Sequence, residues 1–413
     1  IEDKLARRHL ADGATALYDL SSSYLTGEAC DFARRGYSRD GKKGTLQVNY
    51  GLLTDQVGRP VAVTMYPGNT ADSLTFGDQV ELLRDRFKLQ DVVLVGDRGM
   101  ITQAHLETLK RDGFNWVTAL KSGAIRKLVG TGAIQLGLFD ERNLASITHP
   151  DYPGEQLVAC RNPALAERRR HVRENLIEAT RVVLASIKAR VEAGKIEGED
   201  AIGLAVGRVV DRYKVAKHFS LTISARDFEY RVNEDSVREE AALDGLYVIR
   251  TSLASERLTP AEAVRTYKLL GQVERAFRCL KTVDLKVRPI HHRLVDRVAT
   301  HLFLCVLAYY VEWHLREVWA PLTFADEEAL PPLEREPVLP ATRSQSARRK
   351  TTALATTDGL PVHSFRTLLD ALATLTRNTC RRPGGSATFS LDSLPDEVQA
   401  KAFRLISTIP TVW

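Results

Sequence analysis

The stretch Tyr267–Lys281, which reads YKLLGQVERAFRCLK, decides how this 413-residue chain is interpreted. Tyr267, Glu274 and Lys281 follow at seven-residue steps, close to two helical turns, so one helix would stack them on nearly one line. Glu274 is then expected beside a core-facing stripe, where an ionised carboxylate needs a partner such as a cation. The stripe consists of the apolar residues Leu269, Leu270, Val273, Ala276, Phe277 and Leu280.

The residues before this stretch carry the signals of a helix start. Thr259 suits the N-cap, Pro260 the first helical position, and Glu262 lies three residues after the cap. This pattern is a capping box with the proline that first turns favour. We expect one helix that begins near Pro260 and carries Glu274 deep inside it.

The composition is typical of a soluble globular protein, with 44% hydrophobic and 27% charged residues. A net charge of +6 leans weakly toward a polyanionic partner. The five cysteines include no CxxC pair, which argues against a zinc ribbon and a secreted disulfide framework. We therefore expect reduced, buried thiols in a cytosolic protein.

Several classes of protein and cofactor are disfavoured. The longest apolar run, residues 299–311, is too short to span a bilayer and predicts a buried helix, so we expect no membrane partner. No signal peptide opens the chain. No P-loop or dinucleotide fingerprint occurs, so we expect no nucleotide cofactor. The chain starts with Ile1 instead of Met, so we expect that upstream residues have been removed.

The first 120 residues alternate as β-β-β-α-β-α-β. Apolar alternation and continuous apolar runs predict five strands, and helical spacing predicts two helices. Polar and Pro-Gly breaks separate them, and a Ser-rich turn is expected at the end of the first strand. The strands are expected at 16–24, 46–53, 61–65, 92–95 and 116–120, and the helices at 73–87 and 103–111.

About 140 residues separate this pattern from the helix that bears Glu274, which is too long for a loop. They predict an inserted subdomain with a long basic helix at 164–193 and strands at 218–224, 227–232 and 246–251. The arginines of that helix, Arg168–Arg170 and Arg173, fit either a solvated face or a nucleic-acid contact.

The composition changes again after Trp319, where an acidic, Pro-rich segment precedes the basic, polar residues 342–352. That composition predicts a mobile linker, followed by a last helix near 365–376. We expect four parts: a first part of the core, an insertion, a second part of the core that bears Glu274, and a linker with a C-terminal helical region. Their bounds are 1–121, 122–257, 258–319 and 320–413.

Two aspartates stand where a metal site would need them. Asp19 lies within the first strand and Asp97 at the end of the fourth, and the carboxyl ends of strands in an α/β sheet converge on a crevice. Glu274, from a helix packed across the sheet, could complete the group. Three close carboxylates repel one another, so without a cation at least one pKa should be raised. Hard oxygen ligands of this kind suit Mg²⁺ or Mn²⁺.

In combination these features resemble the DDE transposases of bacterial insertion sequences, in the insertion-sequence-four superfamily, near its subgroup with a long inserted region. The matching helix follows the family's Y-(2)-R-(3)-E-(6)-K signature at Tyr267, Glu274 and Lys281, with Leu270 in place of the Arg. Arg278, one turn beyond Glu274, could serve instead. The other matching stretches are LYDLSSSYLTG (17–27), MYPGNTAD (65–72) and VLVGDRGMIT (93–102).

The resemblance implies an α/β fold, a ribonuclease-H-like mixed sheet flanked by helices and interrupted by an inserted α+β subdomain. It implies that Asp19, Asp97 and Glu274 are catalytic and bind two divalent ions, Mg²⁺ or Mn²⁺. Transposon ends in double-stranded DNA would be cut and joined to target DNA, with Tyr267 and Lys281 holding phosphates. Arg98 could also touch DNA, or merely balance charge.

The family implies further a homodimer on paired ends, a cytoplasmic, nucleoid-associated location, and an end-specific DNA-binding domain before the catalytic core. Two other functions stay open. One is a metal-dependent DNA nuclease that cuts without joining. The other is a catalytically silent, domesticated transposase that only binds DNA.

Overall fold

The computed structural model describes residues 1–135, 137 and 139–409, and their backbone forms two compact units. Among the described residues, one unit combines 1–118 with 251–409, and the other lies within 119–250. The four-part division expected from the sequence stays a prediction.

Eight strands hydrogen-bond in the order β3-β2-β1-β4-β5-β10-β7-β6. Antiparallel pairs join β1 to β2, β2 to β3 and β6 to β7, whereas β4 runs parallel to both β1 and β5. This mixed sheet, flanked by helices, confirms the predicted α/β fold class with a mixed sheet. The strands are β1 (Ala14–Tyr24), β2 (Gln47–Asp55), β3 (Pro60–Pro67), β4 (Val92–Gly96), β5 (Asn115–Ala119), β6 (Leu144–Ile147), β7 (Gln156–Arg161) and β10 (Leu246–Thr251).

Strand β1 continues through its serines, so the expected Ser-rich turn is wrong. Ser22 and Ser23 are fully buried, and the register with β2 runs to the pair Tyr24 and Gln47. The hydroxyls of Ser23 and Tyr50 lie 3.0 Å apart and hydrogen-bond to each other, which satisfies polar groups inside the sheet. Serines are therefore tolerated here because a neighbouring strand supplies their partners.

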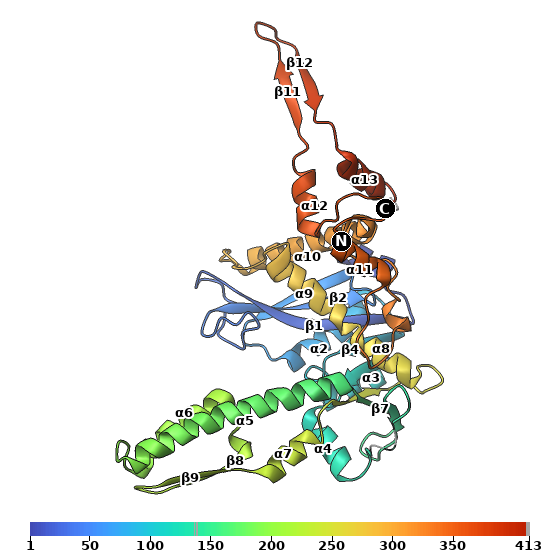
Figure 1. Cartoon of the computed structure of the whole chain (residues 1–413). Coiled ribbons are helices and arrows are strands. Elements are labelled where there is room, and N and C mark those ends of the chain that lie inside the picture. The colour runs from blue at the N-terminus through green and yellow to red at the C-terminus, as the bar shows by residue number, and fades with distance from the viewer. Residues whose placement is uncertain (136, 138, 410–413) are drawn as a thin grey trace. The chain divides into compact units, whose positions relative to one another are not determined.

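Helices cover both faces of the sheet in the first unit (Figure 1). Helices α2 and α3 pack against β1 residues Ala16, Tyr18 and Leu20, whereas α9 contacts β1 and β2 on the other face, where Phe277 meets Tyr50 edge to face. Alternating residues of a strand point to opposite faces, so Asp19 shares the α9 face. The helices are α1 (Glu2–His9), α2 (Asp72–Glu81, continued by a π turn over Leu82–Arg86), α3 (Gln103–Arg111), α8 (Pro260–Lys268), α9 (Leu270–Arg278), the π-helix η4 (Cys279–Val283) and α10 (Val295–Val318).

The second unit contains the long basic helix that the sequence predicts, α5 (Pro163–Glu192). Arg173 of this helix is buried and pairs with Asp244 at 2.5 Å, whereas Arg168–Arg170 are exposed. Helix α6 was not predicted, although its apolar residues pack on α5. The remaining elements are α4 (Ser122–Gly130), α6 (Glu199–Tyr213), a 3-10 turn (Ala216–His218), β8 (Phe219–Ile223), β9 (Phe228–Val232) and α7 (Glu234–Ala241).

Helix α10 is longer than the apolar run that predicted it. Its 24 residues are enough, by length and composition alone, to cross a membrane, so the apolar run underestimated the length of the helix. The same test is passed by the core helix of a soluble protein. One face of α10 is buried, with Val298, Leu302, Val306 and Tyr309 at helical spacing, and the helix packs on β3 and η4.

The segment predicted as a mobile linker contains helix α11 (Gln345–Ala353). Lys350 is buried and donates to the carbonyl oxygens of Ala320, Thr323 and Ala325, a set of long-range contacts that composition does not reveal. The predicted last helix is present as α12. The C-terminal region further contains 3-10 turns (Ala320–Leu322, Pro332–Glu334), α12 (Phe365–Leu372), the exposed hairpin β11 (Arg377–Arg381) and β12 (Thr388–Asp392), and α13 (Glu397–Ile406).

Candidate active site

The first acidic residue of the site, Asp19, lies in the middle of β1. Its Oδ1 accepts a hydrogen bond of 2.8 Å from the backbone N–H of Leu20. Burial raises the pKa of Asp19 to about 7, the nearby charges of Asp97 and Glu274 add to the rise, and Arg39 opposes it. The expected raised pKa is thus present, but loss of solvation contributes more than mutual repulsion.

The second acidic residue of the site, Asp97, follows β4 directly. Tyr18 of β1 pairs with Gly96 of β4, so this parallel register brings Asp19 and Asp97 side by side. Asp97 is exposed, and its Oδ1 accepts hydrogen bonds from the Arg98 backbone N–H at 2.7 Å and from the Tyr267 hydroxyl at 2.8 Å. Burial, and then Asp97, raise the pKa of Tyr267, so this hydroxyl stays a donor.

The helix that bears Glu274 is interrupted, which corrects the expectation of one continuous helix. Its capped start is confirmed: Thr259 and Glu262 form the predicted capping box, and Pro260 opens α8. However, α8 ends at Lys268, and α9 begins at Leu270. A glycine follows at position 271, which weakens a helix by about 1 kcal/mol relative to Ala.

The environment of Glu274 also differs from the expectation. The predicted apolar stripe of α9 is buried, but Glu274 itself is exposed. The carboxylate therefore keeps much of its solvation and does not require a protein partner.

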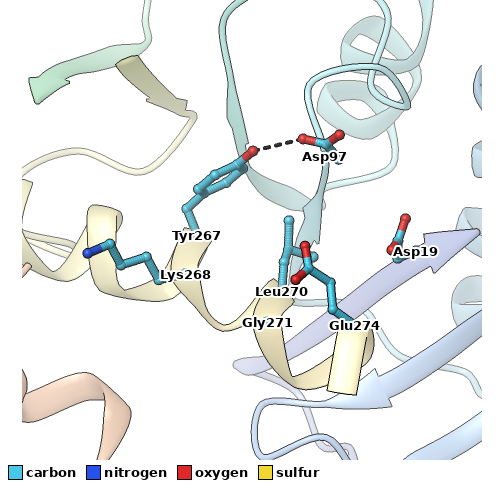
Figure 2. A pocket seen from close by; sticks show the side chains of 7 residues that line it. All are labelled: Asp19, Asp97, Tyr267, Lys268, Leu270, Gly271 and Glu274. Atoms are coloured by element: carbon cyan, nitrogen blue, oxygen red, sulfur yellow. Dashed lines mark hydrogen bonds between the residues drawn. The ribbon is translucent and has the colours of Figure 1, made fainter. Parts of the chain in front are cut away.

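A pocket of about 310 Å³ brings the three carboxylates together (Figure 2). Asp19 enters it from β1, Asp97 from the end of β4, and Glu274 from α9, and Figure 2 shows the hydrogen bond from Tyr267 at its edge. Leu270, at the signature's Arg position, adds an apolar wall. The residues that line the pocket are Asp19, Asp97, Tyr267, Lys268, Leu270, Gly271 and Glu274.

Lys281 lies in the π-helix η4 and does not line the pocket. It is buried, with its ammonium 2.8 Å from both Asp40 Oδ1 and Ser21 Oγ. Arg288 pairs with the same Asp40 oxygen. Burial lowers the pKa of Lys281, while Asp40 opposes that shift. The two other predicted cations, Arg98 and Arg278, are exposed.

Sequence reasoning missed the charged residues between β1 and β2. Arg39, which lowers the pKa of Asp19, pairs with Asp72, and its backbone N–H donates to Ser22 Oγ at 3.0 Å. Asp40 balances Lys281 and Arg288. These residues lie in irregular backbone without periodicity, so the sequence carried no signal for their partners.

This chain is similar to a protein family and to a solved structure. The model of a protein family described as "Transposase DDE domain" matches residues 15–311. Among solved structures, the chain is similar to the cryo-EM structure of the piggyBac transposase synaptic complex with hairpin DNA, at 9% sequence identity and a TM-score of 0.36. The similarity covers 73% of this chain and 46% of the piggyBac transposase chain, so this chain spans less than half the length of that transposase. A comparison with curated proteins finds no match.

Proposed function

We infer that this chain, which belongs to the family of transposase DDE domains, cuts DNA at transposon ends and joins the freed strands to target DNA. The observation that carries this proposal is the convergence of Asp19, Asp97 and Glu274 on one pocket. We propose further that it is a bacterial enzyme of the insertion-sequence-four type, because Tyr267, Glu274 and Lys281 keep the spacing of that signature.

The donor atoms of the pocket fit divalent metal ions. Its three carboxylates offer hard oxygen ligands, which suit Mg²⁺ or Mn²⁺. The raised pKa of Asp19 supports this assignment, because a nearby cation would relieve the unfavourable charge. Two bound ions would activate a water or a 3′-hydroxyl and stabilise the leaving oxygen.

The protein's own residues would prepare the site. Tyr267 donates to Asp97 Oδ1 and so fixes the direction of that carboxylate. Burial raises the pKa of Asp19 to about 7, so part of this carboxyl is still protonated at neutral pH. Only the ionised form can act as an anionic ligand. The fraction of pockets that hold a divalent metal ion should therefore fall as the pH drops below 7.

We propose that DNA is contacted by Tyr267 and by the cations that the sequence predicted, Arg98, Arg278 and Lys281. Arg98 and Arg278 are exposed and free to meet phosphates, and Tyr267 borders the pocket. Lys281 would have to leave Asp40 to reach a phosphate, so we propose that it contacts DNA only after such an exchange. The net charge of +6 favours a polyanion. We propose a homodimer on paired ends, acting in the cytoplasm at the nucleoid.

The test is a joining assay with a labelled duplex that carries the DNA end flanking the gene. In Mg²⁺ or Mn²⁺, the wild type should give nicked and strand-joined products, and Asp97→Asn should give neither. Asp211→Asn is a matched control, because Asp211 is an exposed aspartate on α6 in the other unit. Cleavage without joining would identify a nuclease instead. DNA binding with no metal-dependent product would indicate a silent binding protein.

A further inference from the structure

A second group of metal-ligating side chains lies in the first unit, outside the pocket: Cys279, Asp284 and Glu312. One ligand atom from each, the Cys279 sulfur and one carboxylate oxygen of each acid, lies within 4.8 Å of the other two. We propose that these residues supply three ligands of a buried Zn²⁺ site. The proposal is independent of the transposase reaction.

The π-helix η4 creates this arrangement. It spans Cys279–Val283, and its wide turn sends the backbone N–H groups of Asp284 and Leu285 to the carbonyl oxygen of Cys279, at 3.3 and 3.2 Å. The turn thereby places Cys279 and Asp284 one above the other, as its i to i+5 spacing requires. Glu312 reaches the same point from the buried face of α10, which packs on η4.

Only one oxygen of each carboxylate, Asp284 and Glu312, accepts a hydrogen bond from the described residues. Arg316 donates to Glu312 Oε1 and Asp284 Oδ2, both at 2.6 Å. The remaining oxygens, Glu312 Oε2 and Asp284 Oδ1, are buried without a hydrogen-bond partner among the described residues. The two side chains are 4% and 5% exposed. One guanidinium cannot balance two buried carboxylates, so the cluster requires a further cation or a proton.

The donor set favours zinc over the hard ions assigned to the pocket. A thiolate with oxygen ligands selects Zn²⁺ rather than Mg²⁺ or Mn²⁺. Zinc bonds of about 2.3 Å to sulfur and about 2.0–2.2 Å to oxygen place tetrahedral ligands about 3.3–3.7 Å apart, within the observed limit. Arg316 would hold the outer oxygens, as residues around a metal site commonly do.

Binding would release protons from this cluster. Without metal, burial raises the pKa of Cys279 to about 12 and that of Glu312 to about 7. Zinc would displace the thiol proton and any carboxyl proton, so its affinity should fall in acid. The bound ion would tie η4 to α10 and so fix the end of α9, the helix that carries Glu274.

Metal analysis of the purified full chain after gel filtration tests this proposal. The wild type should retain one zinc per chain, and Cys279→Ser and Glu312→Gln should retain none. Cys305→Ser should keep the zinc, because Cys305 is a free thiol on α10 outside this cluster. Circular dichroism of each variant shows whether it is folded. Asp97→Asn should keep the zinc too, which separates this site from the pocket.

A shared proton between the two carboxyls is the rival explanation, and it predicts different results. The wild type would then hold no more zinc than Cys279→Ser, and Glu312→Gln would keep the wild-type Tm because an amide mimics a protonated acid. Either result would overturn the proposal, as would loss of zinc in Asp97→Asn. Cobalt substitution gives a second readout. A thiolate-to-cobalt charge-transfer band should appear in the wild type and vanish in Cys279→Ser.

Discussion

Two groups of charged residues lie along the same face of strand β1, and they differ in how their charge is balanced. At Ser21, the ion-pair cluster of Asp40, Lys281 and Arg288 is largely buried and contains both signs of charge. Two positions earlier, Asp19 opens into the pocket that it shares with Asp97 and Glu274, where acids predominate.

This difference separates stability from function. Buried charges must be paired, because an unpaired one loses solvation without compensation. The pocket leaves negative charge unbalanced and open to solvent, an arrangement that costs stability but attracts a cation. Mutations in the ion-pair cluster should therefore destabilise the folded protein, and mutations in the pocket should stop the chemistry.

The largest effect is expected for Glu274→Gln. Removal of one member of a catalytic unit should lower DNA cleavage by about 10⁴-fold. Because Glu274 is exposed, the free energy of unfolding should change by no more than about 0.5 kcal/mol. Gel assays and urea denaturation measure the two quantities, with Glu256→Gln, an exposed glutamate outside the pocket, as the control. Full activity in Glu274→Gln would remove this residue from the site.

The next effect concerns stability and belongs to the ion-pair cluster. Asp40→Asn removes the counter-charge of Lys281 and Arg288, so it should lower the free energy of unfolding by about 3 kcal/mol. Urea denaturation monitored by circular dichroism gives this value. A loss below about 1 kcal/mol would show that the buried cations do not depend on Asp40.

The pocket should also make the stability of the protein depend on pH. In the metal-free protein the folded-state pKa of Asp19, about 7, exceeds the unfolded value, so the folded state holds a proton that the unfolded state has lost. Stability should fall as pH rises from about 4 to above 7, by at most about 4 kcal/mol. Tm measured against pH should show this slope, and Asp19→Asn should reduce it. Identical slopes in both proteins would contradict the assignment.

A smaller effect is expected where Tyr267 supports Asp97. Tyr267→Phe removes the donor to Asp97 Oδ1 and should slow cleavage about tenfold, equivalent to about 1.4 kcal/mol. Single-turnover kinetics measure this rate. Tyr37→Phe, at an exposed tyrosine, provides the comparison and should leave the rate unchanged.

The smallest effect is expected at Arg278, one helical turn beyond Glu274. Arg278→Ala should weaken binding to cut ends severalfold and reduce the salt slope by about 1, as loss of one phosphate contact does. Fluorescence anisotropy across a salt series measures both. Arg7→Ala, an exposed arginine on α1, is the matched control. Undiminished binding in Arg278→Ala would show that it does not replace the Arg of the family's signature.

Local patterns explain which parts of the fold could be predicted. Alternation and apolar runs predicted the strands that carry Asp19 and precede Asp97, and the capping box predicted where α8 begins. The break at Leu269 and the π turn of η4 were not predictable, because local spacing favours a regular helix and tertiary contacts override it. The sequence therefore placed Lys281 beside Glu274, although its ammonium meets Asp40.

The same limit applies to the site. Its acids could be predicted from their places on strands and a helix, but their exposure could not, because burial depends on how distant segments pack. Arg39 and Asp40 act through partners far along the chain, and no period in the sequence links them. Likewise, Cys279 and Glu312 meet only because η4 packs on α10.

The most direct test of the central claim is to locate the divalent ion in the folded protein. Fe²⁺ substituted for Mg²⁺, with ascorbate and peroxide, cleaves a polypeptide close to the bound ion, and mass spectrometry identifies the cut sites. We predict cuts next to Asp19, Asp97 and Glu274, suppressed by excess Mg²⁺ and lost in Asp97→Asn. Cuts confined to other segments, or unchanged in Asp97→Asn, would contradict the assignment of this pocket as the metal site.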